Sequence, residues 1–254
     1  KVRSLLSNHA VDISHFHIFQ HQISPSVFQP LRDRNIPIIL TLHDLKPMCP
    51  NYKMYVNGSV CEKCKGEKFY NSVINKCTKG SFFGSVVNML EMYFHHYMRY
   101  YRDVDMYIAV SKFHQKKMVE FGFPIEKISY LPNYIDVSEY QVSNINDGYI
   151  LYFGRLSEEK GLDTLVKAAA LNATIEHYIV GAGPEESILK ELVKKKSITN
   201  VVFLGFKSGD ELKSIVSRAA CIVLPSEVYE NCPMTILESF ASARPVIGSN
   251  IGGI

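Results

Sequence analysis

Residues 225–238 decide how the rest of the chain is interpreted, and they read PSEVYENCPMTILE. They follow a short apolar run, Cys221–Leu224, which indicates a buried strand. Pro233 suits the first turn of a helix, because the amide hydrogen that proline lacks has no partner there. We then expect Glu230 in the loop at the carboxyl end of the strand, and Glu238 about one and a half turns into the helix. Ligands of open α/β sheets bind at that end of the strands, so both carboxylates are candidate ligand contacts.

Composition places the chain among globular proteins, with 46% hydrophobic and 11% aromatic residues. The formal net charge of +3 does not indicate a nucleic-acid partner. The sequence has no apolar run near the ~18 residues of a membrane span and no signal peptide, so we expect a cytoplasmic location. The chain opens inside an expected helix, lacks an initial Met and stops just after an expected strand. We therefore expect a fragment that is truncated at both ends.

Two runs of strands and helices follow one another, which indicates an α/β fold with two domains. Strands are expected at 11–17, 36–41, 105–111 and 128–131, and then at 149–153, 176–180, 201–205, 221–224 and 244–248. Helices are expected at 1–8, 19–34, 81–103, 112–121 and 162–171, and after residues 184, 208 and 233. The polar segment 137–148 is the expected linker.

The predicted helix at 81–103 carries an aromatic stripe. Met89, Tyr93, Tyr97 and Tyr101 recur at four-residue spacing, and such a stripe favours packing into a core. Contact with a membrane surface is the alternative, although the basic residues on the helix are few.

Four of the six cysteines lie in the segment 46–80, which has little hydrophobic periodicity. Without a secretory signal, cysteines favour reduced thiols or a metal site over a disulfide framework. Cys61 and Cys64 form a C-x2-C pair, which Cys49 and Cys77 would complete as a structural zinc site. Four thiolates leave no open position on zinc, so such a site would brace the loop without taking part in catalysis. Free thiols are the alternative.

Residues 154–161 read GRLSEEKG, between an expected strand and an expected helix. Arg155 and Lys160 bracket this loop, and two cations beside a helix N-terminus form an anion site. The alternative is a surface salt bridge to Glu158 or Glu159, worth at most about 1 kcal/mol.

Two further strand ends carry candidate site residues. Gly181 and Gly183 follow the strand 176–180, where glycine permits close approach of the backbone to a ligand. A third glycine is absent from that turn, so it is not a dinucleotide-binding fingerprint. His43 follows the strand 36–41, beside Asp44, where its side chain would face a cleft. A histidine held only by its neighbouring turn is the alternative.

Taken in order, these motifs resemble those of the retaining glycosyltransferases of family 4. They are H-D at His43, V-S near Ser111, P-N near Asn133, G-R-L-x-x-E-K-G, G-x-G-P, and E-x7-E between Glu230 and Glu238. The resemblance implies the GT-B fold, in which two Rossmann-like domains with parallel sheets face a cleft, and both would be incomplete here. Residues 1–145 would be the acceptor-side domain, with the cysteine loop 46–80, and residues 146–254 the donor-binding domain.

By this resemblance, the chain would move a sugar from a nucleotide-sugar donor to an acceptor hydroxyl with retention of configuration, without a catalytic metal or other cofactor. His43 and Glu230 would act on the transferred sugar. The implied donor contacts are Arg155 and Lys160 on the diphosphate, the amides of Met234 and Thr235, Glu238 on the ribose, and Gly181 and Gly183. The loop around Phe206 and Lys207 would lie beside the base, with Phe206 as the candidate contact.

The acceptor implied by the family is a glycan or a lipid-linked glycan, in bacterial polysaccharide or glycolipid synthesis, with a peripheral membrane contact at the inner face left open. Tyr134 stands where the family usually has glycine, so we expect that turn to be built differently. Cys232 stands where phenylalanine or a similar residue is usual, so the shape of that loop, and with it the donor sugar and base, stays open. A GT-B nucleotide-sugar epimerase and a non-catalytic nucleotide-sugar-binding protein are the alternative functions.

Overall fold

The computed structural model describes residues 2–20 and 23–254, and the chain forms two compact units. Lys1 and residues 21–22, which belong to the predicted helices 1–8 and 19–34, lie outside the described residues. The first unit ends at Pro132, and the second runs Asn133–Gly252. The assignment of residues 1–145 to an acceptor-side domain and of residues 146–254 to a donor-binding domain stays a prediction.

The first unit contains a parallel sheet with the strand order β1-β2-β5-β6. Its strands are β1 (Ser14–Phe16), β2 (Ile38–Leu42), β5 (Met106–Ala109) and β6 (Ile128–Tyr130). The helical elements beside them are α1 (Val2–Asn8), η1 (Pro25–Phe28), α2 (Gln29–Arg32), α5 (Lys112–Glu120) and η2 (Ile125–Lys127). Ser111 begins α5 as predicted, because its hydroxyl accepts a hydrogen bond from the His114 amide at 3.1 Å.

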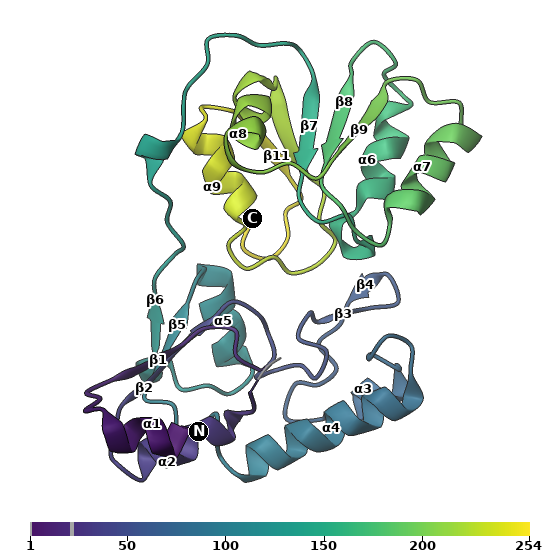
Figure 1. The fold of residues 1–254 in the computed structure, drawn as a ribbon. Helices are drawn as coiled ribbons and strands as arrows, with labels where there is room; N and C mark the ends of the chain where they lie inside the picture. The colour runs from purple at the N-terminus through teal and green to yellow at the C-terminus, as the bar shows by residue number, and fades with distance from the viewer. Residues whose placement is uncertain (1, 21–22) are drawn as a thin grey trace. The chain divides into compact units, whose positions relative to one another are not determined.

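A long segment with helices and a hairpin joins β2 to β5 (Figure 1). It holds a hairpin of β3 (Tyr55–Val56) and β4 (Ser59–Val60), then α3 (Asn71–Ile74) and α4 (Phe82–Tyr97). The predicted helix 81–103 is confirmed over α4, which Ser81 caps by accepting from the Gly84 amide at 3.1 Å. The prediction of a buried aromatic stripe is wrong at Tyr97, which is 83% exposed, whereas Tyr101 is buried beyond the end of the helix. None of the helices within the described residues is both long and apolar enough to cross a bilayer.

The second unit contains a five-stranded parallel sheet with the order β11-β10-β7-β8-β9. The strands are β7 (Ile150–Phe153), β8 (His177–Val180), β9 (Val201–Gly205), β10 (Cys221–Leu224) and β11 (Val246–Gly248). The helical elements are η3 (Val137–Glu139), η4 (Glu158–Lys160), α6 (Leu162–Ala169), α7 (Glu186–Lys195), α8 (Gly209–Arg218) and α9 (Met234–Ala241). Pro233 is the cap residue before α9, one position earlier than the sequence predicts.

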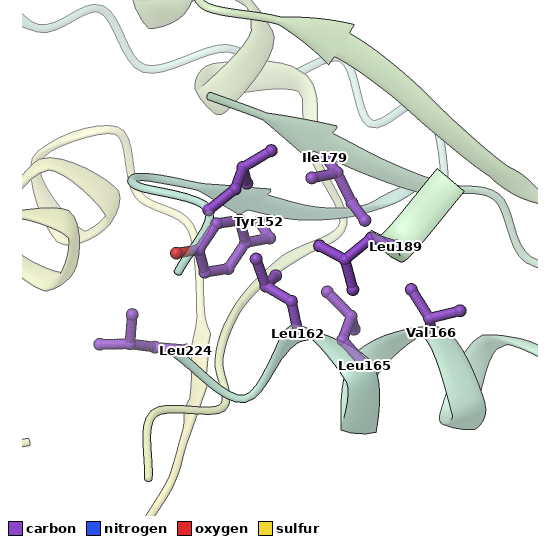
Figure 2. Packing of buried hydrophobic residues seen from close by; sticks show 8 residues of the cluster. Tyr152, Leu162, Leu165, Val166, Ile179, Leu189 and Leu224 are labelled. Atoms are coloured by element: carbon purple, nitrogen blue, oxygen red, sulfur yellow. The ribbon is translucent and has the colours of Figure 1, made fainter. Parts of the chain in front are cut away.

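Apolar side chains fill both faces of this sheet. On one face, Tyr152 and Ile179 of the sheet pack with Leu165 of α6 and Leu189 of α7 (Figure 2). On the other face, Leu151 and Ile222 pack with residues of α8 and its C-terminal end. Helices on both faces of a parallel sheet are the doubly wound arrangement. Strand order changes direction between β7 and β10, so the loops that follow these two strands flank the topological switch point.

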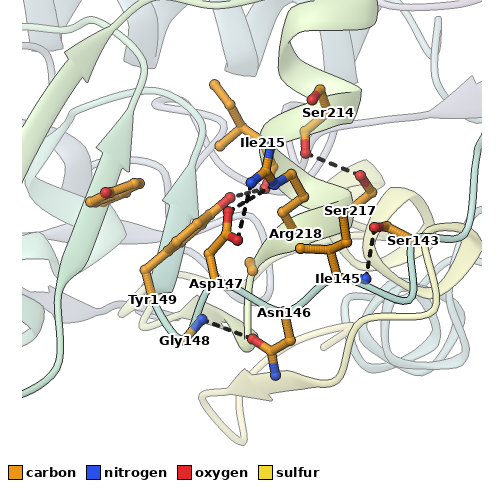
Figure 3. A network of polar contacts seen from close by, with 12 residues as sticks. Ser143, Ile145, Asn146, Asp147, Gly148, Tyr149, Ser214, Ile215, Ser217 and Arg218 are labelled. Carbon is orange, nitrogen blue, oxygen red and sulfur yellow. Dashed lines mark hydrogen bonds and ion pairs between the residues drawn. The ribbon is translucent and has the colours of Figure 1, made fainter.

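The C-terminal end of the predicted linker 137–148 is bound to α8 of the second unit. Arg218 of α8 forms an ion pair with Asp147 at 2.7 Å, and the Asp147 amide donates to the Arg218 carbonyl at 3.0 Å (Figure 3). Tyr149 donates its hydroxyl hydrogen to the Ile215 carbonyl at 2.6 Å. The chain is therefore anchored to α8 just before it enters β7.

Candidate functional site

The loops after β7 and β10 lie against each other at the switch point. The amide of Glu227 donates to the carbonyl of Glu159 at 2.9 Å. Gly161 adopts φ 65°, and a Cβ at this position would lie 2.1 Å from the Pro225 carbonyl oxygen. Only glycine tolerates both the left-handed conformation and this close approach. The glycine at the end of the GRLSEEKG stretch thus lets the two loops meet.

Lys160 and Glu230, one from each loop, form an ion pair. The Ser226 hydroxyl donates to the same carboxylate at 2.6 Å. The side chains of Lys160 and Glu230 are 23% and 11% exposed, so water screens the pair only in part. Both residues were candidates from the sequence, but the alternative salt bridge predicted for this loop involved Glu158 or Glu159. The pairing with Glu230 was not predicted.

Arg155 lies on a cavity of about 300 Å³ at the carboxyl ends of β7, β8 and β9. Gly181 and Phe206 line the same cavity, and so does Lys207, which belongs to the loop that the resemblance places beside the base. Phe206 is 73% exposed, so its ring presents an open face. The structure therefore brings a cation, an aromatic ring and a glycine turn to one opening.

The glycines of the G-x-G-P turn also serve the packing of the protein itself. A Cβ on Gly181 would lie 1.8 Å from the Gly154 carbonyl oxygen, and one on Gly183 would lie 2.0 Å from the Leu156 carbonyl oxygen. These distances are well below any real contact of a Cβ atom, so the loops after β7 and β8 require glycine at both positions. Gly183 is not among the residues that line the cavity.

Glu238 of α9 lies on a neighbouring cavity of about 110 Å³, with Tyr140 and Lys213. Leu212 lines both cavities, so they adjoin along α8. Burial raises the pKa of the Glu238 carboxyl, and the ammonium group of Lys213 opposes that rise. Met234 and Thr235 form the first turn of α9, where no side chain caps the helix, and they line neither cavity.

In the first unit, His43 lies beyond the end of β2 in a cluster of histidines. His17 Nδ1 lies 2.9 Å from His43 Nε2, and the two rings stack with their centroids 5.2 Å apart. His15 Nε2 lies 2.7 Å from Thr41 Oγ1. Burial lowers the pKa of His43, the charge of His17 lowers it further, and Asp44 opposes both effects.

Sequence analysis missed His15 and His17, although a signal was present. His15 lies in β1 and His17 directly follows it, with one residue between them. The strand β1 pairs in parallel with β2. Parallel strands end at the same edge of a sheet, so an H-x-H pair there lies near His43. His114 of α5, which is fully buried, was also missed; burial lowers its pKa to about 4, and the charge of His43 contributes to this.

Burial and neighbouring thiols raise the pKa values of Cys49, Cys64 and Cys77 in the segment 46–80. Burial raises the pKa of Cys49 to about 11 and that of Cys64 to about 12, and the other thiols add to both shifts. The Cys49 thiol donates to Asn51 Oδ1 at 3.0 Å. Over residues 2–20 and 23–254, no group of three or more potential ligands is arranged to hold a metal ion. The structural zinc site stays a prediction from the sequence.

Two family models together match the whole chain. The model of Glycosyltransferase Family 4 matches residues 1–139. The chain belongs to glycosyltransferase family 4. A second model, glycosyl transferases group 1, matches residues 138–254. The two matches confirm the family that the motif order indicates.

Curated members of the family align over part of their length. An uncharacterized glycosyltransferase of Methanocaldococcus jannaschii is 31% identical over 58% of this chain and 43% of that protein. The amylovoran biosynthesis glycosyltransferase AmsK of Erwinia amylovora is 28% identical over 66% of this chain and 44% of that protein. The chain thus spans about half the length of the curated relatives it matches.

Solved structures with this fold align over nearly all of the chain. HepE of Anabaena, in complex with UDP and glucose, has a TM-score of 0.69 over 99% of this chain and 63% of that chain, at 18% identity. Sucrose-phosphate synthase of Thermosynechococcus elongatus has a TM-score of 0.70 over 99% and 60%, at 20% identity. These neighbours have the GT-B fold, so the predicted α/β fold class of GT-B type is confirmed.

Proposed function

We propose that the protein transfers a sugar from a nucleotide-sugar donor to an acceptor hydroxyl, and that its second unit binds the donor. The observation that carries the proposal is the carboxyl edge of the sheet, where the cavity of Arg155 adjoins the cavity of Glu238 and the loops after β7 and β10 are joined by the Lys160–Glu230 pair. A site of this kind offers cations for a diphosphate and carboxylates for sugar hydroxyls within one sheet edge. Family membership and the UDP complex of HepE support the same assignment.

The proposal assigns each part of the donor to named groups of the second unit. In the proposal, the base stacks on Phe206, whose ring is exposed at the mouth of the larger cavity. Glu238 accepts hydrogen bonds from the ribose hydroxyls in the smaller cavity. Arg155 binds the diphosphate, as do the amides of Met234 and Thr235 at the N-terminus of α9. Gly181 and Gly183 keep the backbone close to the donor.

Lys160 has the central electrostatic role in this mechanism. As the bond between the sugar and the diphosphate breaks, negative charge grows on the leaving phosphate, and a cation fixed in advance lowers the energy of that transition state. Glu230 holds Lys160 in place and accepts hydrogen bonds from donor-sugar hydroxyls. With two cations at the diphosphate, the proposed chemistry needs no catalytic metal or other cofactor, and the nucleotide-sugar is the substrate.

His43 is assigned to the transferred sugar by the family resemblance, and retention of the anomeric configuration is part of the same proposal. The setting we propose is bacterial polysaccharide or glycolipid synthesis at the cytoplasmic side of the membrane, with a glycan or lipid-linked acceptor. The biosynthetic name of AmsK supports a polysaccharide product. Analysis of the product's anomeric carbon by NMR tests retention directly.

Calorimetric titration with UDP, GDP and ADP in EDTA tests the donor site. We expect one base to be preferred, and Arg155→Ala to weaken its binding by about 2–4 kcal/mol, because charge-assisted contacts to phosphate are lost. Arg218→Ala is the matched control, since Arg218 is bound to Asp147 in the same unit. Arg218→Ala should leave binding unchanged. A folded chain that binds none of the three, or that binds equally well after Arg155→Ala, would contradict the proposal.

A further inference from the structure

The outward face of α4 is apolar over its whole length. Phe83, Val87, Leu90, Phe94 and Tyr97 are between 54% and 83% exposed. They follow one another at intervals of four, three, four and three residues, which places them on a single stripe of the helix. We call these five residues the α4 apolar face. The helix lies at the edge of the first unit beside α3 (Figure 1).

The opposite side of α4, toward the protein, carries polar groups as well as the buried Met92. Ser85 and His95 are buried there, and Ser85 donates its hydroxyl hydrogen to the Ser81 carbonyl at 2.7 Å. Glu91 forms an ion pair with the buried Lys46 at 2.9 Å. A helix that met water on its outer face would carry its polar residues there and its apolar residues inside. The buried side of α4 is mixed, because Met92 packs there with Phe69 and Cys64, whereas the exposed stripe carries only apolar and aromatic residues and therefore suits an apolar environment.

Exposed cations flank the α4 apolar face at both ends. Lys76 and Lys79 lie in the turn before the helix, and Arg99 follows two residues after its end. Within the residues that the structure describes, no carboxylate forms an ion pair with these three side chains. The nearby Glu67, by contrast, is engaged by Arg102 at 3.1 Å. The uncompensated charge around the stripe is therefore positive.

We propose that the α4 apolar face binds the surface of a bilayer that contains anionic lipids. An amphipathic helix that lies in the interface buries aromatic and aliphatic side chains among the acyl chains, while flanking lysines and arginines bind anionic headgroups. The sixteen residues of α4 would lie parallel to the surface. A second copy of the chain fits this face less well. Antiparallel pairing of two such helices would set the lysines before one helix against Arg99 of the other, and like charges repel.

Vesicle co-sedimentation tests this proposal with the intact protein. Vesicles of phosphatidylcholine alone are compared with vesicles in which about a quarter of the lipid is phosphatidylglycerol. We expect binding to the anionic vesicles, and a loss of about ten-fold or more in partitioning for Phe83→Ser combined with Phe94→Ser. Lys76→Glu combined with Lys79→Glu should weaken binding to the anionic vesicles and leave any binding to the phosphatidylcholine vesicles unchanged. Added salt should have the same effect on the original protein.

Leu171→Ser is the matched control, because Leu171 is 90% exposed on the second unit, away from α4 in the chain. This variant should bind vesicles like the original protein. All five substituted side chains are exposed, so the thermal unfolding temperature should change little, which separates lost binding from lost folding. Unchanged vesicle binding by the Phe83→Ser and Phe94→Ser variant would overturn the proposal. So would a protein that ignores anionic vesicles, or one that forms a dimer which the same two substitutions dissociate.

Discussion

Lys160 and Glu230 form an ion pair although seventy positions separate them in the chain. Lys160 ends the short η4 turn after β7, and Glu230 belongs to the loop after β10. The two strands are neighbours in the sheet, so their following loops meet at its carboxyl edge. This ion pair thus joins the two loops that carry the proposed donor site. A substitution in the pair is therefore expected to affect both the stability of the second unit and donor binding.

The Lys160–Glu230 pair should contribute measurably to stability. Glu230→Gln leaves a partly buried ammonium group without its carboxylate, and we expect the free energy of unfolding to fall by about 1–3 kcal/mol. A double-mutant cycle with Lys160→Met, followed by urea unfolding, measures the coupling. The control cycle uses Lys167 and Asp163, an ion pair whose side chains are about half exposed. That cycle should give about 0.5 kcal/mol or less, and a Lys160–Glu230 coupling no larger than this would contradict the prediction.

Gly161→Ala should destabilise the second unit more than an equal change at Gly209. Both glycines have a positive φ, 65° and 58°, so alanine is strained at either by about 1–2 kcal/mol. At Gly161 the added methyl group would also meet the Pro225 carbonyl oxygen, whereas nothing lies within 4 Å at Gly209. We expect an additional cost of about 1–3 kcal/mol at Gly161. Thermal or urea unfolding of the two variants measures it, and equal losses would show that the two loops do not constrain each other.

His114 should make the protein less stable in mild acid. Its pKa in the folded protein is about 4, because of burial, against an ordinary value of 6.5. Between these values the unfolded chain binds a proton that the folded chain does not, so stability falls as pH drops from 6.5 toward 4 and is independent of this group above 6.5. His114→Leu should flatten the curve of unfolding free energy against pH by up to about 1.4 kcal/mol per pH unit.

Other histidines with lowered pKa values, such as His95 and His177, act in the same direction, so the informative quantity is the difference between the two proteins. His9→Leu, at an exposed position in the same unit, serves as the control. Parallel curves for the original protein and His114→Leu would show that His114 does not titrate in this window.

His17 should tune the ionisation of His43. The charge of His17 is the second cause, after burial, of the lowered pKa of His43. His17→Phe keeps an aromatic ring at the position while it removes both the charge and the contact at 2.9 Å, so we expect the pKa of His43 to rise. NMR titration of the imidazole resonances measures this without any assay of activity. His9→Phe should leave His43 unchanged, and an unmoved or lowered pKa in His17→Phe would refute the coupling.

Much of the fold could be predicted because strands and loops are encoded locally. Apolar runs predicted the strands of both sheets, and the residues after them supplied most candidate contacts, including Arg155, Lys160 and Glu230. Phe206 and Lys207 likewise follow β9 directly. The helix α4 was predicted from its pattern, but the side that faces the protein was not. Its apolar residues predicted burial by the ordinary rule of amphipathic helices, and the structure buries Met92 but exposes a second apolar stripe that includes Tyr97.

The α/β class, the order of strands and loops, and the family could be predicted from local patterns, because each depends on residues that are neighbours in the chain. The pairing of Lys160 with Glu230 and the burial of His114 emerged only in the folded chain, and the contact of His17 with His43 follows only once β1 is known to pair with β2. These contacts depend on which strands become neighbours in a sheet. That order is set by packing over the whole unit, and the local pattern of apolar and polar residues does not record it.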